Sequence, residues 1–306
     1  MSLLQHFKSK GPSGFGYGST AEDVTAGLSL GGRKILVTGC NSGLGLETVR
    51  VLALRGAQVI GLARTVKKAQ EALEGLDGNP RAMACELSDP KSVAACVAAL
   101  KEDGTKLDAI ICNAGIMALP KLEKVHGYEK QFFTNHIGHF MLVTGLLDSL
   151  TDTGRVVMVS SEAHRRAPES GIEFDNLDGS RSYNDWKAYG QSKLANLLFA
   201  KELGRQLAGT GKTANAIHPG VIATNLMRSM NPLAAMAMRI ATPLVLKSIS
   251  QGAATQCYVA THPDAAKTSG EYWSDSNPKK PRDDGADAAL AKKLWERSEK
   301  IVAEVS

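Results

Sequence analysis

The segment KILVTGCNSGLG spans residues 34–45 and decides the fold. Its first five residues, Lys34–Thr38, form a short apolar, β-branched run that ends at a glycine, and a segment of helical period, Leu44–Arg55, follows. Glycines at positions 39, 43 and 45 let the backbone turn sharply and approach a ligand, and a helix N-terminus favours the charge of a pyrophosphate. This strand, turn and helix predict a dinucleotide-binding unit; a glycine turn built only for packing is the alternative.

Similar short apolar runs recur along the chain and alternate with segments of helical period. They are Gln58–Ala63, Ala82–Leu87, Asp108–Ala114, Arg155–Ser160, Thr213–His218 and Glu271–Ser274. Strands that alternate with helices predict parallel βαβ units, and continuous apolar runs predict a sheet that is covered on both faces. We therefore predict an α/β fold: a single doubly wound (Rossmann) domain, with a mostly parallel seven-stranded sheet and helices on both faces.

The chain has 306 residues, which by length alone suggests two domains. It contains no internal repeat and no proline-rich linker, so we predict an N-terminal arm over residues 1–31 and one dinucleotide-binding catalytic domain over residues 32–306. Within the arm, Ser19-Thr20-Ala21-Glu22 has the pattern of a capping box and predicts a short helix.

Composition excludes several classes of protein and partner. Lys plus Arg exceeds Asp plus Glu by 36 − 31 = 5 residues, which is too dilute for nucleic acid but suits an acidic small ligand if the charge is focused in one cleft. The five cysteines are odd in number and show no C-x-x-C spacing, so we expect reduced, buried thiols. The sequence shows no secretory leader, no long uninterrupted apolar stretch and no cluster with metal-ligand spacing. These features predict a cytoplasmic protein with no integral membrane segment and no metal.

The end of the second predicted strand indicates which dinucleotide binds. An NAD site usually has an Asp or Glu here to hold the ribose 2′-hydroxyl, but Ala63 occupies the position and Arg64 follows it. Lys67 and Lys68 come one turn later. A guanidinium in place of a carboxylate fits a 2′-phosphate, so we predict NADP(H); a solvated basic helix start is the alternative.

A tyrosine and a lysine later in the chain are candidate catalytic residues. Tyr189 and Lys193 are four residues apart, which places them on one face of a helix. A nearby ammonium favours the phenolate and is expected to lower the tyrosine pKa. Upstream, Ser160-Ser161 ends a predicted strand at the carboxyl edge, where open α/β sheets bind ligands.

In combination these motifs resemble one family. Thr38–Gly45, Asn113-Ala-Gly115, Asn135, Ser161, Tyr189-x-x-x-Lys193 and Pro219-Gly220 follow the order and approximate spacing of the short-chain dehydrogenase/reductase family over residues 32–275. Within it the sequence resembles the subgroup of retinol dehydrogenases and light-dependent protochlorophyllide reductase. The segments TNHIGHF (134–140), AYGQSKLAN (188–196) and HPGVIAT (218–224) carry that closer resemblance.

The resemblance implies four catalytic residues. Tyr189 is expected to be the general acid that protonates a carbonyl oxygen, and Ser161 is expected to hold that oxygen, with Ser160 as the competing choice. Lys193 is expected to bind the nicotinamide ribose and depress the pKa of Tyr189, and Asn135 to anchor a water in a proton relay to Lys193. The cofactor supplies the hydride.

The resemblance also implies a set of residues that contact the cofactor. They are Gly39, Asn41, Ser42, Gly43, Leu44, Gly45, Arg64, Glu86, Leu87, Asn113, Ala114, Gly115, Tyr189, Lys193, Pro219, Gly220, Val221, Ile222 and Thr224. Two positions depart from the family pattern. Glu86 replaces the usual Asp near adenine, and Cys112 replaces the first Asn of the usual Asn-Asn-Ala-Gly, as it does in some protochlorophyllide reductases.

Three remaining features concern the substrate. The 28 positions between Ser161 and Tyr189 exceed the spacing in compact family members, so an excursion over the cleft is expected at 168–186. Residues 225–248 are rich in methionine and predict a substrate lid, with core packing and a membrane-surface helix as alternatives. The pair His136 and His139 resembles a nucleotide-binding signature but falls in a predicted mid-chain helix, so we set it aside.

The resulting hypothesis is an NADP(H)-dependent oxidoreductase that transfers hydride between nicotinamide and the carbonyl or alcohol of a bulky apolar substrate. A ring double-bond reductase of the protochlorophyllide type is the first alternative, and a non-catalytic NADP-sensing regulatory protein is the second. The expected partner is the small apolar substrate, with no nucleic acid, and the chain is expected to be a homodimer or a monomer.

Overall fold

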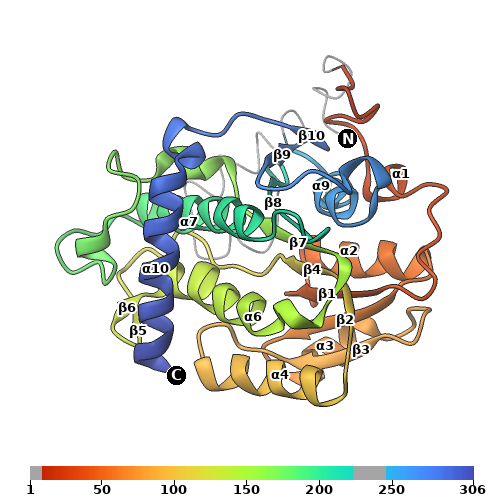
Figure 1. The fold of residues 1–306 in the computed structure, drawn as a ribbon, viewed down its shortest axis with the longest axis horizontal. Helices are drawn as coiled ribbons and strands as arrows, with labels where there is room; N and C mark the ends of the chain where they lie inside the picture. Colours follow the sequence, from red (N-terminus) through yellow and green to blue (C-terminus); the bar gives the residue numbers. More distant parts are fainter. Residues whose placement is uncertain (1–8, 223–245) are drawn as a thin grey trace.

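The computed structural model describes residues 9–222 and 246–306, which form a layered α/β fold (Figure 1). Its main sheet has eight strands in the order β10-β9-β8-β7-β4-β1-β2-β3. The strands are β1 (Lys34–Thr38), β2 (Gln58–Ala63), β3 (Arg81–Ala84), β4 (Leu107–Cys112), β7 (Leu150–Val159), β8 (Thr213–His218), β9 (Tyr272–Ser274) and β10 (Asn277–Pro278). All pairings in this sheet are parallel except β9 with β10. The fold class is therefore confirmed.

The strand count differs from the prediction by one. The seven predicted runs all form strands, and β10 is the eighth. It contributes only two residues and pairs antiparallel to β9 across a tight turn at Asp275 and Ser276, where φ is 54° and 60°. A two-residue strand that contains a proline shows no hydrophobic period, so the sequence pattern does not reveal it.

Helices cover both faces of the sheet (Figure 1). They are α1 (Ala21–Val24), α2 (Gly43–Leu54), α3 (Val66–Leu73), α4 (Pro90–Glu102), α5 (Lys130–Phe132), α6 (Gly138–Leu146), α7 (Asp185–Gln206), α9 (Ile249–Thr261) and α10 (Ala288–Val305). A small hairpin, β5 (Lys124–Val125) with β6 (Tyr128–Glu129), stands apart from the main sheet. In the described ranges, 9–222 and 246–306, we find no helix with the length and apolarity to span a bilayer.

The period-2 alternation of the strands divides the core into two layers. On β1, Leu36 belongs to the core layer that also contains residues of α4, α6, α7 and α10, whereas Ile35 and Val37 belong to the layer with residues of α1, α2, α3 and α9. On β7, Met158 faces the first layer and Val157 the second. A sheet buried on both faces explains why its strands read as continuous apolar runs.

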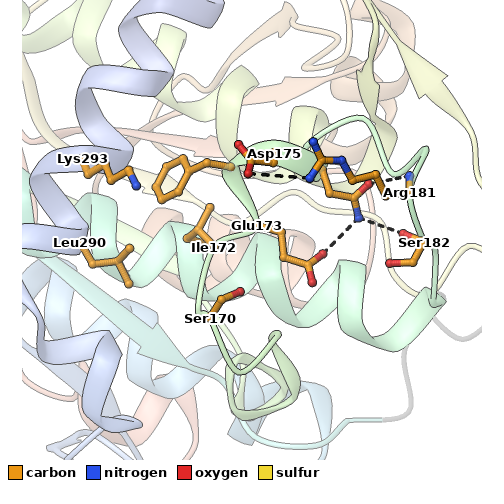
Figure 2. Close-up of a pocket in the computed structure, with 10 residues that line it drawn as sticks. Ser170, Ile172, Glu173, Asp175, Arg181, Ser182, Leu290 and Lys293 are labelled. Atoms are coloured by element: carbon orange, nitrogen blue, oxygen red, sulfur yellow. Dashed lines mark hydrogen bonds and ion pairs between the residues drawn. The ribbon is translucent and has the colours of Figure 1, made fainter.

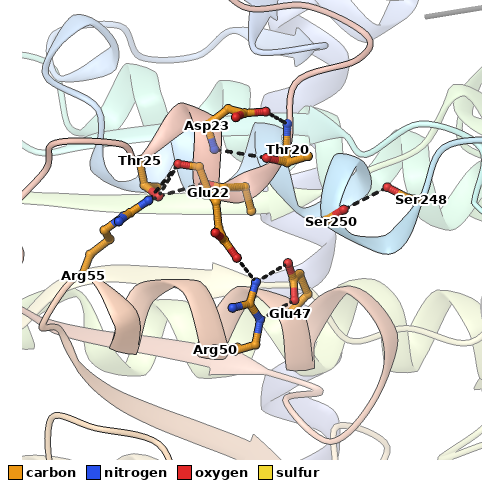
Figure 3. A network of polar contacts seen from close by, with 10 residues as sticks. Thr20, Glu22, Asp23, Thr25, Glu47, Arg50, Arg55, Ser248 and Ser250 are labelled. Atoms are coloured by element: carbon orange, nitrogen blue, oxygen red, sulfur yellow. Dashed lines mark hydrogen bonds and ion pairs between the residues drawn. The ribbon is translucent and has the colours of Figure 1, made fainter. Parts of the chain in front are cut away.

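The arm packs on the second layer through α1 (Figure 3). Glu22 forms an ion pair of 2.5 Å with Arg50 of α2, and its carbonyl accepts a hydrogen bond of 2.9 Å from Arg55. The predicted capping box exists one residue later than expected, because Thr20 caps α1 and pairs reciprocally with Asp23. A hydroxyl at both 19 and 20 leaves the sequence pattern ambiguous by one position.

Candidate active site

The turn between β1 and α2 brings backbone segments into close contact. Gly39 has a φ of 67°, and its amide donates a hydrogen bond of 2.8 Å to the carbonyl of Leu62 on β2. A Cβ atom on Gly39 would lie 3.1 Å from Ala114, and one on Gly45 would overlap the Gly39 carbonyl. Both positions therefore require glycine, the first for conformation and both for packing.

Helix α2 begins directly after this turn. Its N-cap is Ser42, whose side chain makes no capping hydrogen bond, and its first residue is Gly43, with a φ of 54°. Asn41 and Ser42 are exposed, while Leu44 is buried beneath the turn. A helix N-terminus without a side-chain cap offers amide N–H groups and a positive dipole end to an anion, so these residues fit a pyrophosphate.

The residues after β4 fasten this turn from the other side. Asn113 Nδ2 donates to the carbonyl of Thr38 at 2.9 Å, and the Ala114 amide donates to Thr38 Oγ1 at 2.9 Å. The predicted cofactor residues 39–45 and 113–115 therefore meet at one edge of the sheet.

Arg64 follows β2 directly and is exposed, as are Lys67 and Lys68 at the start of α3. Thr65 caps α3 by accepting from the Lys68 amide at 3.4 Å. Because β1 and β2 are adjacent and parallel, Arg64 emerges from the same sheet edge as the glycine turn. The three cations stand at the edge where the ribose end of a dinucleotide would lie.

Glu86 and Leu87 lie just past β3. The Glu86 carboxylate accepts hydrogen bonds from the amide and hydroxyl of Ser88, at 3.1 and 2.9 Å, so it is engaged within its own loop. Leu87 is buried, and its carbonyl packs against Gly138 at the start of α6.

Ser161 lies beside Tyr189, close enough for its hydroxyl to lower the pKa of the tyrosine. Tyr189 lies in the second turn of α7, and Ser161 is the N-cap of a 3₁₀ helix, Glu162–Arg166, that follows β7. The Ser161 Oγ accepts from the Ala163 amide at 3.1 Å, so its own proton remains available for a hydrogen bond. The competing Ser160 is buried and donates at 2.7 Å to the carbonyl of Lys193, away from this pair.

Burial raises the pKa of Tyr189 to about 12, while the nearby Ser161 hydroxyl acts in the opposite direction. The predicted lowering of this pKa is wrong for the protein alone. The Lys193 ammonium lies 5.7 Å from the centre of the tyrosine ring, and burial of the phenol is the largest influence on its pKa. Tyr189 is therefore a protonated phenol at neutral pH, which suits a proton donor.

Lys193 lies one turn after Tyr189 on α7 and is 4% exposed. Its Nζ donates a hydrogen bond of 2.9 Å to the carbonyl of Val159, and burial lowers its pKa to about 8. A cation that is this poorly hydrated readily exchanges its proton near neutral pH.

Asn135 is fully buried within a π-helix, Phe133–Ile137. Its Oδ1 accepts from the Ile116 amide at 2.8 Å, and its Nδ2 donates to the Ile116 carbonyl at 2.9 Å and to Ser192 Oγ at 3.0 Å. π-helical segments are rare and frequently mark functional sites. These bonds hold Asn135 against α7, next to Lys193.

Gly115 lies between the two polar residues just described. A Cβ atom added to it would lie 3.1 Å from Asn135 Oδ1 and 3.4 Å from Lys193 Nζ. The structure therefore brings Gly115, Asn135 and Lys193 together.

Sequence reasoning missed the role of His139. This buried ring bonds Thr38 Oγ1 through Nε2 at 2.9 Å and the Asn135 carbonyl through Nδ1 at 2.8 Å. Since the Asn135 carbonyl can only accept, Nδ1 carries the ring proton and donates to it, and Nε2 of the neutral ring accepts from the Thr38 hydroxyl. The spacing of four residues between Asn135 and His139 was the one sign in the sequence of this contact.

The predicted nicotinamide segment is only partly described. Pro219 is buried, and Gly220 has a φ of 98° with no room for a Cβ beside the side chain of Lys247. Residues 221–222 pair with Lys247, which forms an ion pair of 2.6 Å with Asp275. Thr224 and most of the predicted lid, residues 223–245, lie outside the described residues.

Val221, within this segment, is 49% exposed.

Cys112 is completely buried in β4, and burial raises the pKa of its thiol. Cys112 is therefore a core residue and not part of the site. Across residues 9–222 and 246–306 no three His, Cys, Asp or Glu side chains gather as a metal site would require.

The excursion at 168–186 contacts the C-terminal helix. A surface pocket of about 490 Å³ lies between them (Figure 2). Ile172 and Phe174 line it from the excursion, and Leu290 and Lys293 line it from α10. Lys293 Nζ lies 4.4 Å from the centre of the Phe174 ring. Only Trp186 of this stretch, whose ring centre is 6.2 Å from that of Tyr189, contacts a predicted catalytic residue through its ring.

Comparison with known proteins places these features in a family. The profile described as short chain dehydrogenase matches residues 33–174. The chain is 42% identical to short-chain dehydrogenase TIC 32 B, chloroplastic, of Brassica napus, over 95% of both chains. It is 36% identical to retinol dehydrogenase 14 of Mus musculus, over 89% of this chain and 86% of the relative.

Solved structures share the fold. A protein from Mycobacterium Paratuberculosis, titled as putative and uncharacterized, is 35% identical, with a TM-score of 0.75 over 94% of this chain and 98% of that one. A short chain dehydrogenase from Burkholderia cenocepacia J2315, solved in complex with NADP, is 24% identical, with a TM-score of 0.63 over 80% and 96% of the two chains.

Proposed function

Because this chain belongs to the short-chain dehydrogenase/reductase family, in its retinol dehydrogenase-like subgroup, we propose that it transfers hydride between NADP(H) and the carbonyl or alcohol of a bulky apolar substrate. The observation that carries the proposal is the position of Ser161 beside Tyr189, with Lys193 one helical turn away on α7. An acid, an oxygen-binding hydroxyl and a buried cation in this arrangement are what carbonyl reduction needs.

The residues present fit a dinucleotide. Gly39 and Gly45 leave no room for side chains at the turn, and the N-terminus of α2 lacks a side-chain cap. Arg64 stands at the sheet edge without a neighbouring carboxylate at position 63, which supports the 2′-phosphorylated form. When bound, the nicotinamide would supply or accept the hydride.

The protein's own contribution is proton transfer and orientation. In the reducing direction the Tyr189 phenol donates its proton to the substrate oxygen, and Ser161 donates a hydrogen bond to the same oxygen. Lys193 then favours the phenolate that is left behind, because an ammonium nearby stabilises a negative charge. We propose that Asn135, which bonds the Ile116 backbone and the Ser192 hydroxyl of α7, keeps Lys193 connected to protons from the solvent.

An assay of NADPH oxidation, followed by absorbance, against a panel of apolar aldehydes and ketones tests this function. The wild type should turn over at least one of them, and Tyr189→Phe should lose on the order of 10²–10⁴-fold in kcat. Equal rates in the two proteins would overturn the mechanism. Activity that requires illumination would instead favour the ring double-bond reductase, whose one supporting residue, Cys112, is buried in the core.

NADPH binding with no turnover of any substrate would favour the regulatory alternative. We propose further that the protein prefers NADP(H), that its substrate is bulky and apolar, and that residues 225–248 form a lid. The domain limits and the roles of the site residues given under Sequence analysis are part of the same proposal.

A further inference from the structure

The segment between β10 and α10 contacts the 3₁₀ helix that follows Ser161. Arg282 is the centre of this contact, because its Nη1 donates to the Ala167 carbonyl at 2.9 Å and its Nη2 donates to the Pro168 carbonyl at 3.0 Å. An ion pair of 2.6 Å with Asp284 orients the guanidinium. One arginine thus satisfies two carbonyls at the end of the helix.

His164 connects the same segment to the serine itself. The ring is completely buried, with Nε2 accepting from the Arg282 amide at 3.2 Å and Nδ1 lying 2.6 Å from the Ser161 carbonyl oxygen. Since Nε2 accepts, the proton of the neutral ring is on Nδ1, and Nδ1 donates to Ser161. The backbone amide of His164 donates to that same carbonyl at 3.0 Å.

Helix α7 meets the 3₁₀ helix on the tyrosine side. A Cβ atom on Gly190, the residue after Tyr189, would lie 2.7 Å from the Ala163 carbonyl and 2.7 Å from the Ala167 amide. The backbone after Ser161 therefore touches α7 directly at the catalytic tyrosine. Its position is determined by α7 and by the contacts to His164 and Arg282.

We propose that His164 and Arg282 are positioning residues that hold the Ser161 hydroxyl at a fixed position relative to the Tyr189 phenol. The proposal rests on the function proposed above, in which Ser161 binds the substrate oxygen. It gives Arg282, which is far from the catalytic motifs in sequence, a role in positioning Ser161. A misplacement of about 1 Å is enough to cost on the order of 10²-fold in rate, so these contacts act on the chemical step.

The test places His164→Leu, His164→Asn and Arg282→Met in the wild type and in Ser161→Ala. His164→Leu removes both ring contacts and should lower kcat about tenfold or more in the wild type, with the KM for NADPH unchanged. In the Ser161→Ala background the same change should cost less than about twofold, because residues that act through one group are not additive. His164→Asn retains a donor at the Nδ1 position and should recover part of the loss.

Lys280→Met is the matched control from the same segment. Its side chain is exposed and pairs only with the exposed Asp283 among the described contacts, so kcat should not change. Equal fold losses from His164→Leu in both backgrounds would show that the histidine serves stability alone and would overturn the proposal.

If the wild type turns over no carbonyl, the proposed function fails and hydrogen exchange decides the positioning role. Amides 162–168 should exchange faster in His164→Leu and Arg282→Met, and not in Lys280→Met. Unchanged exchange in all three variants would overturn the inference.

Discussion

Lys193 Nζ donates a hydrogen bond of 2.9 Å to the carbonyl oxygen of Val159, the last residue of β7. The strand that delivers Ser161 therefore also anchors the ammonium that serves Tyr189. Burial makes this anchor costly, since it lowers the pKa of Lys193 from its ordinary value of 10.5 to about 8. The energetic consequence can be measured separately from catalysis.

Lys193→Met should abolish catalysis and stabilise the fold. Below pH 8 the folded protein must keep a charged amine where it is poorly hydrated, whereas the unfolded chain keeps it in water. We expect the variant to be more stable than the wild type at pH 7 by on the order of 2 kcal/mol. The Val159 carbonyl keeps a partner, because Asn196 Nδ2 also donates to it at 3.3 Å.

The gain should be pH-dependent, and urea unfolding at pH 7, 8.5 and 10 measures it. As the pH rises from 8 to 10.5, the unfolded chain carries the extra proton, so the wild type gains stability and the advantage of the variant shrinks. An advantage that stays constant up to pH 10 would contradict the lowered pKa of Lys193.

Gly115→Ala should slow proton transfer without unfolding the chain. The added methyl would lie 3.1 Å from Asn135 Oδ1 and 3.4 Å from Lys193 Nζ, tight enough to displace both polar groups by a few tenths of an ångström. We expect kcat to fall about tenfold, because small misplacements near the reacting groups are costly. Gly31→Ala is the control, since its nearest neighbour would be 4.0 Å away. Equal activity of the two variants would argue against a relay at this point.

Sequence patterns predicted seven strands of the main sheet and missed the two-residue β10. Strands β1 and β2 coincide with the predicted runs because both lie inside the sheet, where both faces demand apolar residues. The two-residue β10 has no period to detect. The site motifs were named through resemblance to a family, and the structure brings most of them to one sheet edge.

The contacts that organise the site could not be predicted from the sequence. Thr38 bonds His139 across 101 positions, and His164 bonds Arg282 across 118 positions. No local pattern reports such pairs, because they depend on how the strands and helices pack. The pKa of Tyr189 was likewise mispredicted, since the sequence shows a lysine one turn away but not how deeply the phenol is buried.

Arg64→Ala should weaken the binding of NADPH and not that of NADH. A guanidinium that binds the 2′-phosphate contributes a charge-assisted hydrogen bond, so its loss should raise the KM for NADPH about 10–100-fold and leave the KM for NADH within about twofold. Steady-state kinetics with both cofactors measures the difference. Lys91→Ala, another exposed cation at a helix start, controls for net charge. A parallel rise in both KM values would show that Arg64 does not read the phosphate.

The protein should lose stability between pH 6.5 and pH 5 because it buries neutral histidines. Burial lowers the pKa of His136 to about 3, and of His139 and His218 to about 4. In this pH range the unfolded chain binds protons that the folded chain refuses, so unfolding becomes more favourable as the pH falls. We expect each histidine to contribute on the order of 2 kcal/mol by pH 5, measured by urea unfolding.

His136→Phe should remove one of these contributions. The ring lies among Phe132, Phe140 and Phe199, so an apolar aromatic ring fits its surroundings, and Ser298 still donates to the Leu294 carbonyl at 2.8 Å. The pH dependence of its unfolding free energy should therefore be shallower than that of the wild type by up to one proton. A wild type whose stability is flat from pH 6.5 to 5 would mean that these rings take up protons while the protein stays folded.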